Sequence, residues 1–336
     1  MDMKSVSRVL FVKPSNSSFI ENDKTTLKKL YDVKEILYND SVKKKVLQRM
    51  ALYFNIFKKI IWCDVVFSWF GGYHTYIILK IAQLFRKRRI TVIGGYEIAN
   101  IPDIEYGSMI NNESKERVKY IIHHSSVIIA VSKYVLNQIK NIDKKAHVEL
   151  VYNSMDLPEI TIPKKKRIVA TVGYFSDFNK VKLKGLDVFL ECAKRIEDVT
   201  FLIIGVDDTL RKKIVFPPNV IVRGRMDRDQ VLRELSSVKV YCQFSMLESF
   251  GMATLEAMSL NCLPVVSNRG ALPELVRDSG YIVPYGDIEK STASILKALN
   301  QKNNFNPRKR VETFFNNDKK IKKYQQIISN IASEVK

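Results

Sequence analysis

The stretch that decides the fold of this chain is Ser245–Val276, which reads SMLESFGMATLEAMSLNCLPVVSNRGALPELV. It follows an apolar run of strand length, Val238–Phe244, and opens on a loop that contains a Phe-Gly pair. After Gly251, apolar residues recur at helical spacing, and the run at 263–267 predicts another strand. A strand, a glycine-containing loop, a helix and a second strand predict a βαβ unit of a parallel sheet.

Two glutamates, Glu248 and Glu256, stand on either side of this Phe-Gly pair. The start of a helix offers free backbone N–H groups and the positive end of the helix dipole, which suit a diphosphate, and Gly251 lets a phosphate approach closely. Glu256 lies roughly 7.5 Å further along the helix at ~1.5 Å per residue, which is the order of the separation between a diphosphate and its ribose. The spacing indicates a nucleotide-sugar site. The alternative is a surface loop acid and a helix-face acid.

Apolar runs of strand length alternate with amphipathic segments throughout the chain. The expected strands are Arg8–Val12, Val33–Leu37, Asp64–Trp69, Ile90–Ile93, Ser126–Val131, His147–Val151, Arg167–Val172, Thr200–Gly205, Val220–Val222, Val238–Phe244, Leu263–Ser267 and Tyr281–Val283. The expected helices include Ser41–Lys59, Tyr73–Phe85, Ser114–His123, Lys133–Lys140, Gly185–Ile196, Asp227–Ser236, Gly251–Leu260, Ile288–Leu299 and Lys319–Ser333. The pattern predicts two doubly wound α/β domains, with a linker at Pro158–Lys166, where two prolines and a basic run separate two strands.

Composition agrees with two folded domains. The chain has 336 residues, of which 46% are hydrophobic and 27% charged, and this excludes a disordered or fibrous protein. No stretch reaches the ~18–20 apolar residues of a membrane-spanning helix, and the N-terminal sequence has no signal-peptide pattern, so a cytoplasmic location is expected. Four separated cysteines without CxxC spacing predict buried, reduced thiols.

The net charge of +20 is spread over both halves of the chain. A positive field attracts phosphate-bearing partners, whether a nucleotide, a nucleic acid or an anionic membrane, and it also promotes solubility. The sequence carries no recognition motif for nucleic acid, so the positive charge is the one feature that supports a nucleic-acid partner.

Ser245–Val276 resembles the donor-site signature of retaining family 4 glycosyltransferases of the GT-B fold, whose Glu-x7-Glu corresponds to Glu248 and Glu256. The resemblance covers most of residues 167–290 and is weaker before the linker. Its other matching segments are Gly173–Gly185, Thr200–Gly205, Val222–Gly224, Tyr281–Asp287, Ile128–Val135 and Val151–Leu157.

This resemblance implies an α/β protein of GT-B type, with two Rossmann-like domains facing across a cleft. Residues 1–157 would bind an acceptor, residues 161–315 would bind the nucleotide-sugar donor, and the helix in 316–336 would return to the first domain. The implied activity is transfer of a sugar from a nucleoside-diphosphate sugar, of UDP or GDP type, to a hydroxyl of a glycan or lipid-linked acceptor. No further cofactor and no metal are implied.

In the donor domain, the resemblance assigns Glu256 to the ribose and Glu248 to the sugar near its reacting carbon. Ser249, Phe250 and Gly251 would present main-chain groups to the diphosphate and the sugar.

The loop after that domain's first strand, which begins at Gly173, would also contact the donor, with Lys184 on the diphosphate. Tyr174 stands where the family has an arginine. This departure removes one cation from the leaving group, and Lys180 or Lys182 would substitute for it. Arg225 would border the nucleotide base; the alternative for all these cations is a solvated surface.

The first half departs further from the family. Its first expected strand is followed by Pro14–Ser18 instead of a glycine-rich loop, and Gly94–Glu97 lacks the histidine that many members carry. The acceptor-side candidates are therefore Glu97, Asp103 and His74, each with a structural alternative.

Two further pairs of residues resemble metal ligands. His123 and His124 are adjacent residues at the end of an expected helix, so their side chains point about 100° apart. No nearby cysteine or acidic cluster completes a ligand set for a metal. For Asp207-Asp208 a helix N-cap is the expected role.

A peripheral contact with an anionic membrane is a further expectation. Aromatic residues surround the third expected strand, and together with helix Ser41–Lys59 and the basic run Arg86–Arg89 they would rest on a bilayer and admit a lipid-linked acceptor. Core packing explains the aromatics equally well, and each basic run is most simply a solvated face.

Three other functions stay open: a nucleotide-sugar epimerase, a nucleic-acid-binding protein or DNA-modifying glucosyltransferase, and a nucleotide-sugar binding protein without turnover.

Overall fold

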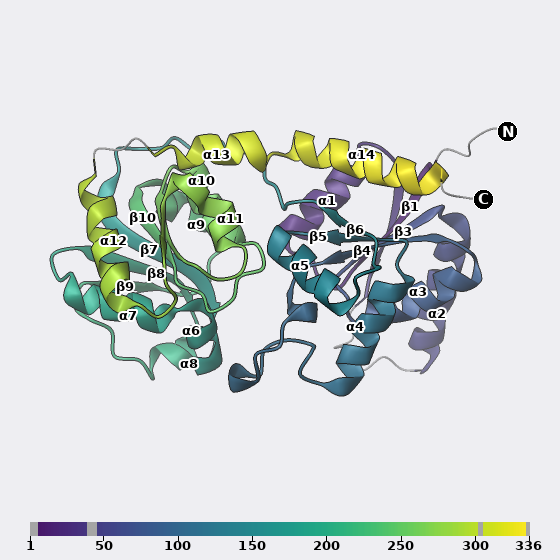
Figure 1. Ribbon diagram of the computed structural model, residues 1–336, viewed down its shortest axis with the longest axis horizontal. Coiled ribbons are helices and arrows are strands. Elements are labelled where there is room, and N and C mark those ends of the chain that lie inside the picture. Colours follow the sequence, from purple (N-terminus) through teal and green to yellow (C-terminus); the bar gives the residue numbers. More distant parts are fainter. Residues whose placement is uncertain (1–5, 39–45, 302–304, 334–336) are drawn as a thin grey trace. The chain divides into compact units, whose positions relative to one another are not determined.

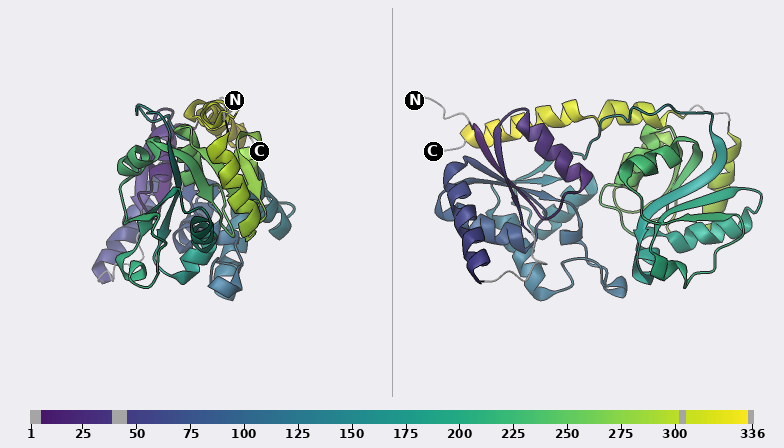
Figure 2. Two further views of the ribbon diagram at one scale, coloured as in Figure 1. Left: turned by 90° about the vertical axis from the view of Figure 1, so that its left-hand side faces the viewer. Right: turned by 180° about the vertical axis from the view of Figure 1, so that it is seen from behind.

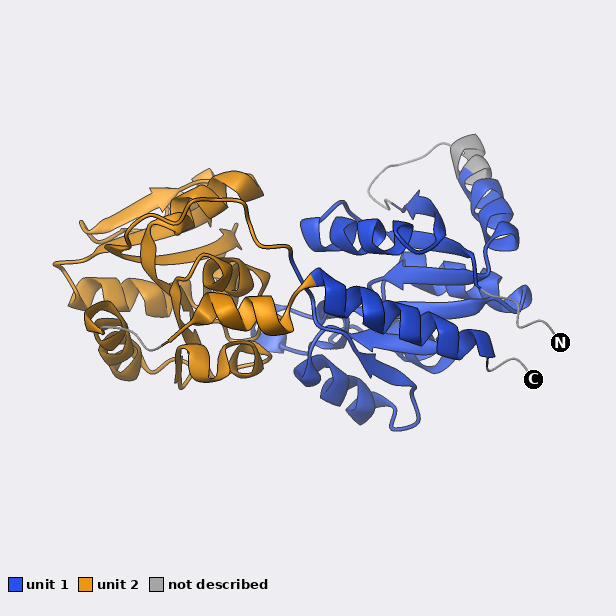
Figure 3. Ribbon diagram, turned by 90° about the horizontal axis from the view of Figure 1, so that it is seen from above, with its two compact units in different colours: residues 1–155, 317–336 blue, residues 156–316 orange. Residues whose placement is uncertain are grey.

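The computed structural model of the chain describes residues 6–38, 46–301 and 305–333. The chain divides into two compact units: residues 1–155 with 317–336 form the first, and residues 156–316 form the second (Figure 3). The expected helix Ser41–Lys59 begins in residues 41–45, which lie outside the described part.

The first unit is built on a parallel six-stranded sheet with the order β2-β1-β3-β4-β5-β6 (Figure 1). Its strands are β1 Arg8–Lys13, β2 Asp32–Leu37, β3 Val65–Trp69, β4 Arg88–Ile93, β5 Val127–Ala130 and β6 Val148–Leu150. Its helices are α1 Ser18–Lys28, α2 Val46–Trp62, α3 Tyr73–Leu84, α4 Asn112–His124, α5 Lys133–Ile142 and α14 Asn317–Ser333, with short 3₁₀ turns η1 Tyr96–Ile98 and η2 Pro102–Ile104. Strands β1, β3 and β5 are buried along almost their whole length, which explains their continuous apolar runs.

The second unit repeats this plan with the strand order β12-β11-β10-β7-β8-β9. Its strands are β7 Lys166–Phe175, β8 Thr200–Val206, β9 Val220–Arg223, β10 Val238–Gln243, β11 Leu263–Ser267 and β12 Tyr281–Val283. Its helices are α6 Phe178–Lys184, α7 Leu186–Arg195, α8 Asp208–Arg211, α9 Arg228–Ser236, α10 Met252–Ser259, α11 Leu272–Val276, α12 Ile288–Asn300 and α13 Pro307–Phe314, and η3 Arg277–Ser279 is a 3₁₀ turn. Helices lie on both faces of the sheet (Figure 2), so the predicted doubly wound architecture and its twelve strands are confirmed.

Several helices were not predicted, and α6 is the one that bears on function. Residues 173–185 were expected to form a loop, but Phe178–Lys184 is helical. The Asp177 side chain caps the start by accepting from the Lys180 N–H at 2.8 Å, and Gly185, with φ of +70°, ends it in the left-handed region. The sequence NKVKLK alternates charged and apolar residues, so its periodicity does not reveal the helix.

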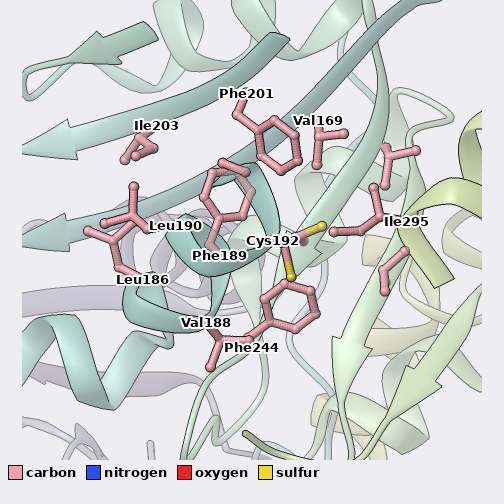
Figure 4. Close-up of a cluster of buried hydrophobic side chains, with 14 of the residues drawn as sticks. Val169, Leu186, Val188, Phe189, Leu190, Cys192, Phe201, Ile203, Phe244 and Ile295 are labelled. Atoms are coloured by element: carbon pink, nitrogen blue, oxygen red, sulfur yellow. The ribbon is translucent and has the colours of Figure 1, made fainter. Parts of the chain in front are cut away.

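One core cluster of the second unit lies between the sheet and helices α7 and α12 (Figure 4), and a second includes residues of α9 and α10. Phe189 of α7 meets Phe201 of β8 edge to face with ring centroids 5.2 Å apart, and Cys192 lies fully buried beside them. All four cysteines are buried and free, as predicted. Burial raises the pKa of the Cys192 thiol to about 11, so it packs as a small apolar side chain.

The basic run Arg86–Arg89 was expected to be a solvated face, and this expectation was wrong for three of its members. Lys87, Arg88 and Arg89 each donate hydrogen bonds to carbonyls at the carboxyl end of a different helix, where a positive charge complements the helix dipole. Lys87 Nζ donates to the carbonyl oxygens of Ile61 (2.9 Å) and Cys63 (2.7 Å) at the end of α2. The Arg88 guanidinium donates to the carbonyl oxygens of Ile331 (2.5 Å) and Ala332 (2.7 Å) in α14. Arg89 Nε donates to the carbonyl oxygen of His124 (2.7 Å) in α4.

Helix α14 makes a buried polar contact with the rest of the first unit. Asp23 of α1 is fully buried and accepts hydrogen bonds from Trp69 Nε1 at 3.1 Å and from the Tyr324 hydroxyl at 2.5 Å. Lys320 forms an ion pair with its second carboxylate oxygen. Residues from the two ends of the chain therefore share one buried site.

Candidate functional site

The carboxyl edge of the second sheet contains the point where the strand order reverses. Strands β8 and β9 follow β7 on one side, and β10 lies on its other side, followed by β11 and β12. Ligands of doubly wound sheets bind in the crevice at this point, so the segments after β7 and β10 define the candidate site.

The segment after β10 leads into the helix start that the sequence indicated. Gly251 has φ of +99°, a conformation that favours glycine, and α10 begins at Met252 without a side-chain cap. Its first-turn N–H groups have no partner within the helix and stay available to a ligand. A second glycine, Gly270, packs this segment against the one after β11: a Cβ there would lie 2.1 Å from the carbonyl oxygen of Glu248, which accepts from the Ala271 N–H at 2.7 Å.

Glu248 and Lys184, which were predicted separately as donor contacts, are brought together here. Lys184 Nζ lies 2.8 Å from Glu248 Oε2, and 27% and 16% of the two side chains are exposed. Below them a chain of polar side chains crosses the buried end of β10: Gln243 Nε2 donates to Ser245 Oγ at 2.7 Å, and that hydroxyl donates to Glu248 Oε2 at 3.4 Å. The carboxylate is thus held from two sides, while part of it still faces solvent.

Glu256 lies in α10 with only 9% of its surface exposed. Burial raises the pKa of its carboxyl group, and the guanidinium of Arg228, whose Nε donates to Oε1 at 2.6 Å, opposes this effect. The sequence interpretation missed Arg228, the first residue of α9, because α9 and α10 come into contact only in the folded sheet. In the sequence, Arg228 is an ordinary residue of the first helical turn after the cap Asp227, and no motif marks it as a partner of Glu256.

A cavity of about 410 Å³ lies at the carboxyl ends of β7 and β8. Gly173, Tyr174 and Arg225 line it, and the Arg225 guanidinium stands 5.9 Å from the centre of the Tyr174 ring. Tyr174 is 54% exposed. The remaining lining residues are Val172, Ile204, Gly205, Met226 and Val231, so the cavity is largely apolar with one aromatic ring and one cation.

The other predicted donor residues differ in what they offer. The ring of Phe250 is buried and packs edge to face against Phe315 at 5.8 Å, so its side chain serves the core. Ser249 beside it is partly exposed. Lys180 and Lys182 lie on α6, whose last residue is Lys184.

The acceptor-side candidates of the first unit lie in different environments. Glu97 is buried and accepts from the backbone N–H groups of Gly71 (2.9 Å), Gly94 (3.2 Å) and Gly95 (2.8 Å), which joins the segments after β3 and β4. His74 is also buried, with Nε2 2.8 Å from the Trp69 carbonyl oxygen. Asp103 is exposed in η2. In Glu97 and His74 the functional atoms thus contact the unit's own backbone.

The residues that resembled metal ligands have other contacts. Asp207 caps α8 by accepting from the Thr209 N–H at 2.9 Å, as expected. His124 stacks on Tyr120 with ring centroids 3.9 Å apart, and His123 lies 3.7 Å from Asp143. In the part of the chain that the structure describes, no three His, Cys, Asp or Glu side chains gather as a metal site would require.

None of the helices in the described ranges is long and apolar enough to cross a membrane.

The fold is shared with solved glycosyltransferase structures. Sucrose-phosphate synthase from Thermosynechococcus elongatus superposes with a TM-score of 0.75 at 13% identity, covering 98% of this chain and 100% of that one. The two sheets therefore form the GT-B fold, as predicted. Structures with this fold include complexes with UDP and a sugar.

Residues 169–301 match the family described as Glycosyl transferases group 1, so this segment is a glycosyltransferase domain. The predicted class of enzyme is confirmed at the level of this domain, whereas assignment to family 4 stays a prediction.

Curated relatives extend the match. N-acetyl-alpha-D-glucosaminyl L-malate synthase of Bacillus anthracis is 25% identical over 289 residues, covering 77% of this chain and 73% of that protein. An uncharacterized glycosyltransferase of Methanocaldococcus jannaschii, MJ1178, is 33% identical over 186 residues, covering 52% of this chain. The matched part spans about half of that relative, 49% of its length.

Proposed function

We propose that this protein is a retaining glycosyltransferase that moves a sugar from a nucleoside-diphosphate sugar to an acceptor hydroxyl. One observation carries the proposal: Glu248 and Glu256 flank the start of α10 at the point where the strand order of the second sheet reverses. Proteins of this fold that were solved with UDP and a sugar support a donor of this class.

In this proposal the donor extends across the carboxyl edge of the second sheet. The diphosphate lies at the first-turn N–H groups of α10 and near Lys184, and the ribose hydroxyls bind Glu256. The cavity beside Tyr174 and Arg225 takes the base, since an aromatic ring and a guanidinium both stack on planar groups. The sugar then reaches Glu248.

The ion pair between Lys184 and Glu248 has a direct role in this scheme. A bound diphosphate carries more negative charge than a carboxylate, so it draws Lys184 Nζ away from Glu248 Oε2. Glu248 then accepts hydrogen bonds from the sugar hydroxyls. The lysine serves the leaving group, and the glutamate positions the reacting ring.

The transfer step breaks the bond between the anomeric carbon and the diphosphate oxygen, and it forms a bond from that carbon to the acceptor oxygen on the same face. The acceptor proton passes to the departing diphosphate. Lys184 and the α10 amides stabilise the charge that develops on this leaving group, which is usually the largest contribution to such catalysis. The first unit would bind the acceptor, a glycan or a lipid-linked hydroxyl, and the donor would be of UDP or GDP type with no metal required.

Thermal unfolding in the presence of UDP, GDP, ADP, CMP and their sugar conjugates tests the donor site. A ligand at ~100 times its Kd stabilises the folded state by ~2.7 kcal/mol, so one nucleoside diphosphate should raise Tm selectively. Glu256→Ala should weaken the binding of that ligand by ~1–3 kcal/mol, because the ribose hydroxyls lose a buried partner. Glu289→Ala, on the exposed first turn of α12, is the matched control and should leave the shift unchanged.

Turnover is tested with the nucleotide identified in this way. Free nucleotide should be released only when an acceptor is present, and Glu248→Gln should lose this release while keeping the Tm shift. Proton NMR of the product should show the anomeric configuration of the donor. The absence of any nucleotide-dependent shift would overturn the proposed donor site, and an inverted product would overturn the retaining mechanism.

A binding protein without turnover is the second candidate, favoured by Tyr174 at the family's arginine position. It predicts the same Tm shift with no nucleotide release for any acceptor.

A further inference from the structure

The outer surface of α2 is unusual for a helix that packs on a sheet. Its inner face carries Ile56 and Ile60, which are fully buried, so its opposite face should be polar. Instead, large apolar side chains are exposed there and at the end of α3. They are Tyr53 (41% exposed), Phe54 (60%), Phe57 (43%), Ile61 (48%) and Leu84 (81%), and we call this surface the α2–α3 face.

The members of this face belong to one continuous surface. The ring of Phe57 packs edge to face against Phe85, the residue after α3, at 5.1 Å. Lys87 Nζ, two residues further on, donates to the Ile61 carbonyl oxygen at 2.9 Å. Figures 1 and 2 show α2 and α3 side by side on one face of the sheet.

Along the chain, the segments that contain this face carry charge of a single sign. Residues 52–63 contain two basic residues, Lys58 and Lys59, and no acidic residue, and residues 65–96 contain five basic residues and no acidic residue. Asp64, which separates the two segments, is neutralised by Arg8 at 2.8 Å. Within the face, Lys58 lies over the Phe54 ring at 4.4 Å and carries its charge among the apolar side chains.

A basic cavity of about 340 Å³ adjoins this face at the amino ends of β1, β3 and β4. Phe85 belongs to its lining, together with Arg86, Lys87, Arg88 and the ion pair between Arg8 and Asp64, so the cations outnumber the single carboxylate. The side chains of Lys87 and Arg88 donate to backbone carbonyls, which carry no full negative charge, so their positive charge is not cancelled there. Arg86 is exposed.

We propose that the α2–α3 face rests on an anionic lipid bilayer, with a phosphate-bearing lipid headgroup in the adjoining basic cavity. Exposed aromatic and aliphatic side chains enter the boundary between headgroups and acyl chains, and the surrounding cations are drawn to anionic lipid. A second copy of this chain fits less well, since two such faces would bring positive charge against positive charge.

This contact leaves the carboxyl edge of the first sheet free. Helix α3 starts at the carboxyl end of β3 and runs back toward the amino ends of the strands, so Leu84 lies at the opposite edge from the segments after β3 and β4. The inference does not depend on the proposed transfer reaction, because vesicle binding is measured without donor or acceptor.

Flotation of the full chain with vesicles tests this inference. Binding to vesicles that mix phosphatidylglycerol with phosphatidylcholine should be strong and should weaken with salt, whereas binding to phosphatidylcholine alone should be weak. Leu84→Gln should lower the vesicle partition coefficient about tenfold, since a Leu side chain gains ~1.5 kcal/mol or more on burial. Val215→Gln is the matched control, because Val215 is 93% exposed in the second unit and far from this face in the sequence.

The charge is tested separately with Arg86→Glu against Lys212→Glu, an exposed lysine after α8. Each charge near an anionic surface contributes about 1 kcal/mol, so Arg86→Glu should weaken binding by at least about fivefold, and Lys212→Glu should not. Tryptophan fluorescence confirms that the first unit is folded in Leu84→Gln and Arg86→Glu, and far-ultraviolet circular dichroism confirms the fold of the two control variants.

Three results would overturn the inference. One is equal binding to neutral and anionic vesicles, or no binding to either. Another is a concentration-dependent dimer that Leu84→Gln disrupts, which would assign the face to a second copy. The third is stabilisation by free glycerol phosphate without vesicle binding, which would assign the cavity to a soluble phosphate compound.

Discussion

Replacing Lys320 with methionine removes a cation from a carboxylate that water does not reach. Asp23 is fully buried, and only 2% of the Lys320 side chain is exposed. In Lys320→Met, the carboxylate keeps its hydrogen bonds from Trp69 and Tyr324 but loses its counter-ion. Breaking a buried ion pair by removing one partner costs about 3–5 kcal/mol, so the free energy of unfolding of the first unit should fall by that amount.

The double variant Asp23→Asn, Lys320→Met is the control. The asparagine oxygen can still accept from Trp69 and Tyr324, and no charge is left buried. A buried ion pair replaced as a whole is often nearly neutral, so most of the loss should be recovered, leaving about 1–2 kcal/mol.

Urea denaturation followed by tryptophan fluorescence measures this effect in the first unit alone. The chain has two tryptophans, Trp62 and Trp69, and both lie in residues 1–155. A loss below about 1 kcal/mol in Lys320→Met would refute the buried ion pair, because surface pairs contribute about that much or less. A double variant as unstable as the single one would show that lost packing, and not the uncompensated charge, is the cause.

Two further predictions concern single residues. Burial would raise the pKa of Asp64, but hydrogen bonds from the Arg8 guanidinium and from backbone N–H groups outweigh this and hold it at about 2. A carboxyl group whose pKa is lower in the folded than in the unfolded chain stabilises the fold at a pH above its unfolded pKa, and this stabilisation is lost as the pH falls through its folded pKa. The free energy of unfolding should therefore fall by about 1–2 kcal/mol between about pH 4 and pH 2. Asp64→Asn should make the free energy of unfolding less dependent on pH in this range. Gly185→Ala should lower the stability of the second unit by at least about 2 kcal/mol in thermal unfolding, because φ is +70° and the new Cβ would lie 2.0 Å from the Phe244 carbonyl oxygen. Gly286→Ala, with φ of +78° and no atom within 4 Å of the new Cβ, carries the backbone strain alone and should lose about 1 kcal/mol; equal losses would show that the close approach at Gly185 has no cost.

The inner strands of both units were predictable because most of their residues are buried, whereas the edge strands β2, β6, β9 and β12 are more exposed. A buried parallel strand such as β3, VVFSW at 65–69, is apolar at every position but Ser68, and such runs stand out from the sequence. The start of α10 was predictable for a similar local reason, since the Phe-Gly pair and the apolar helix after it depend on neighbouring residues only.

Helix α1 shows where this reasoning fails. Its buried residues are Ile20, Asp23, Thr26 and Leu27, so half of its inner face is polar and its apolar periodicity is weak. Asp23 is tolerated there because Lys320, 297 positions later in the numbering, supplies the opposite charge. A pattern based on apolar spacing cannot reveal a helix whose inward charge is neutralised from the other end of the chain.

The sequence by itself determined the twelve strands, the two doubly wound sheets and the two glutamates beside the start of α10, because burial and helix initiation act over a few adjacent residues. Only the tertiary structure decided the partners of those glutamates. Lys184 reaches Glu248 across 64 positions and Arg228 reaches Glu256 across 28, in both cases because parallel strands bring their carboxyl ends to one edge of the sheet. Electrostatic contacts act through space, so they are settled only when the sheet has formed.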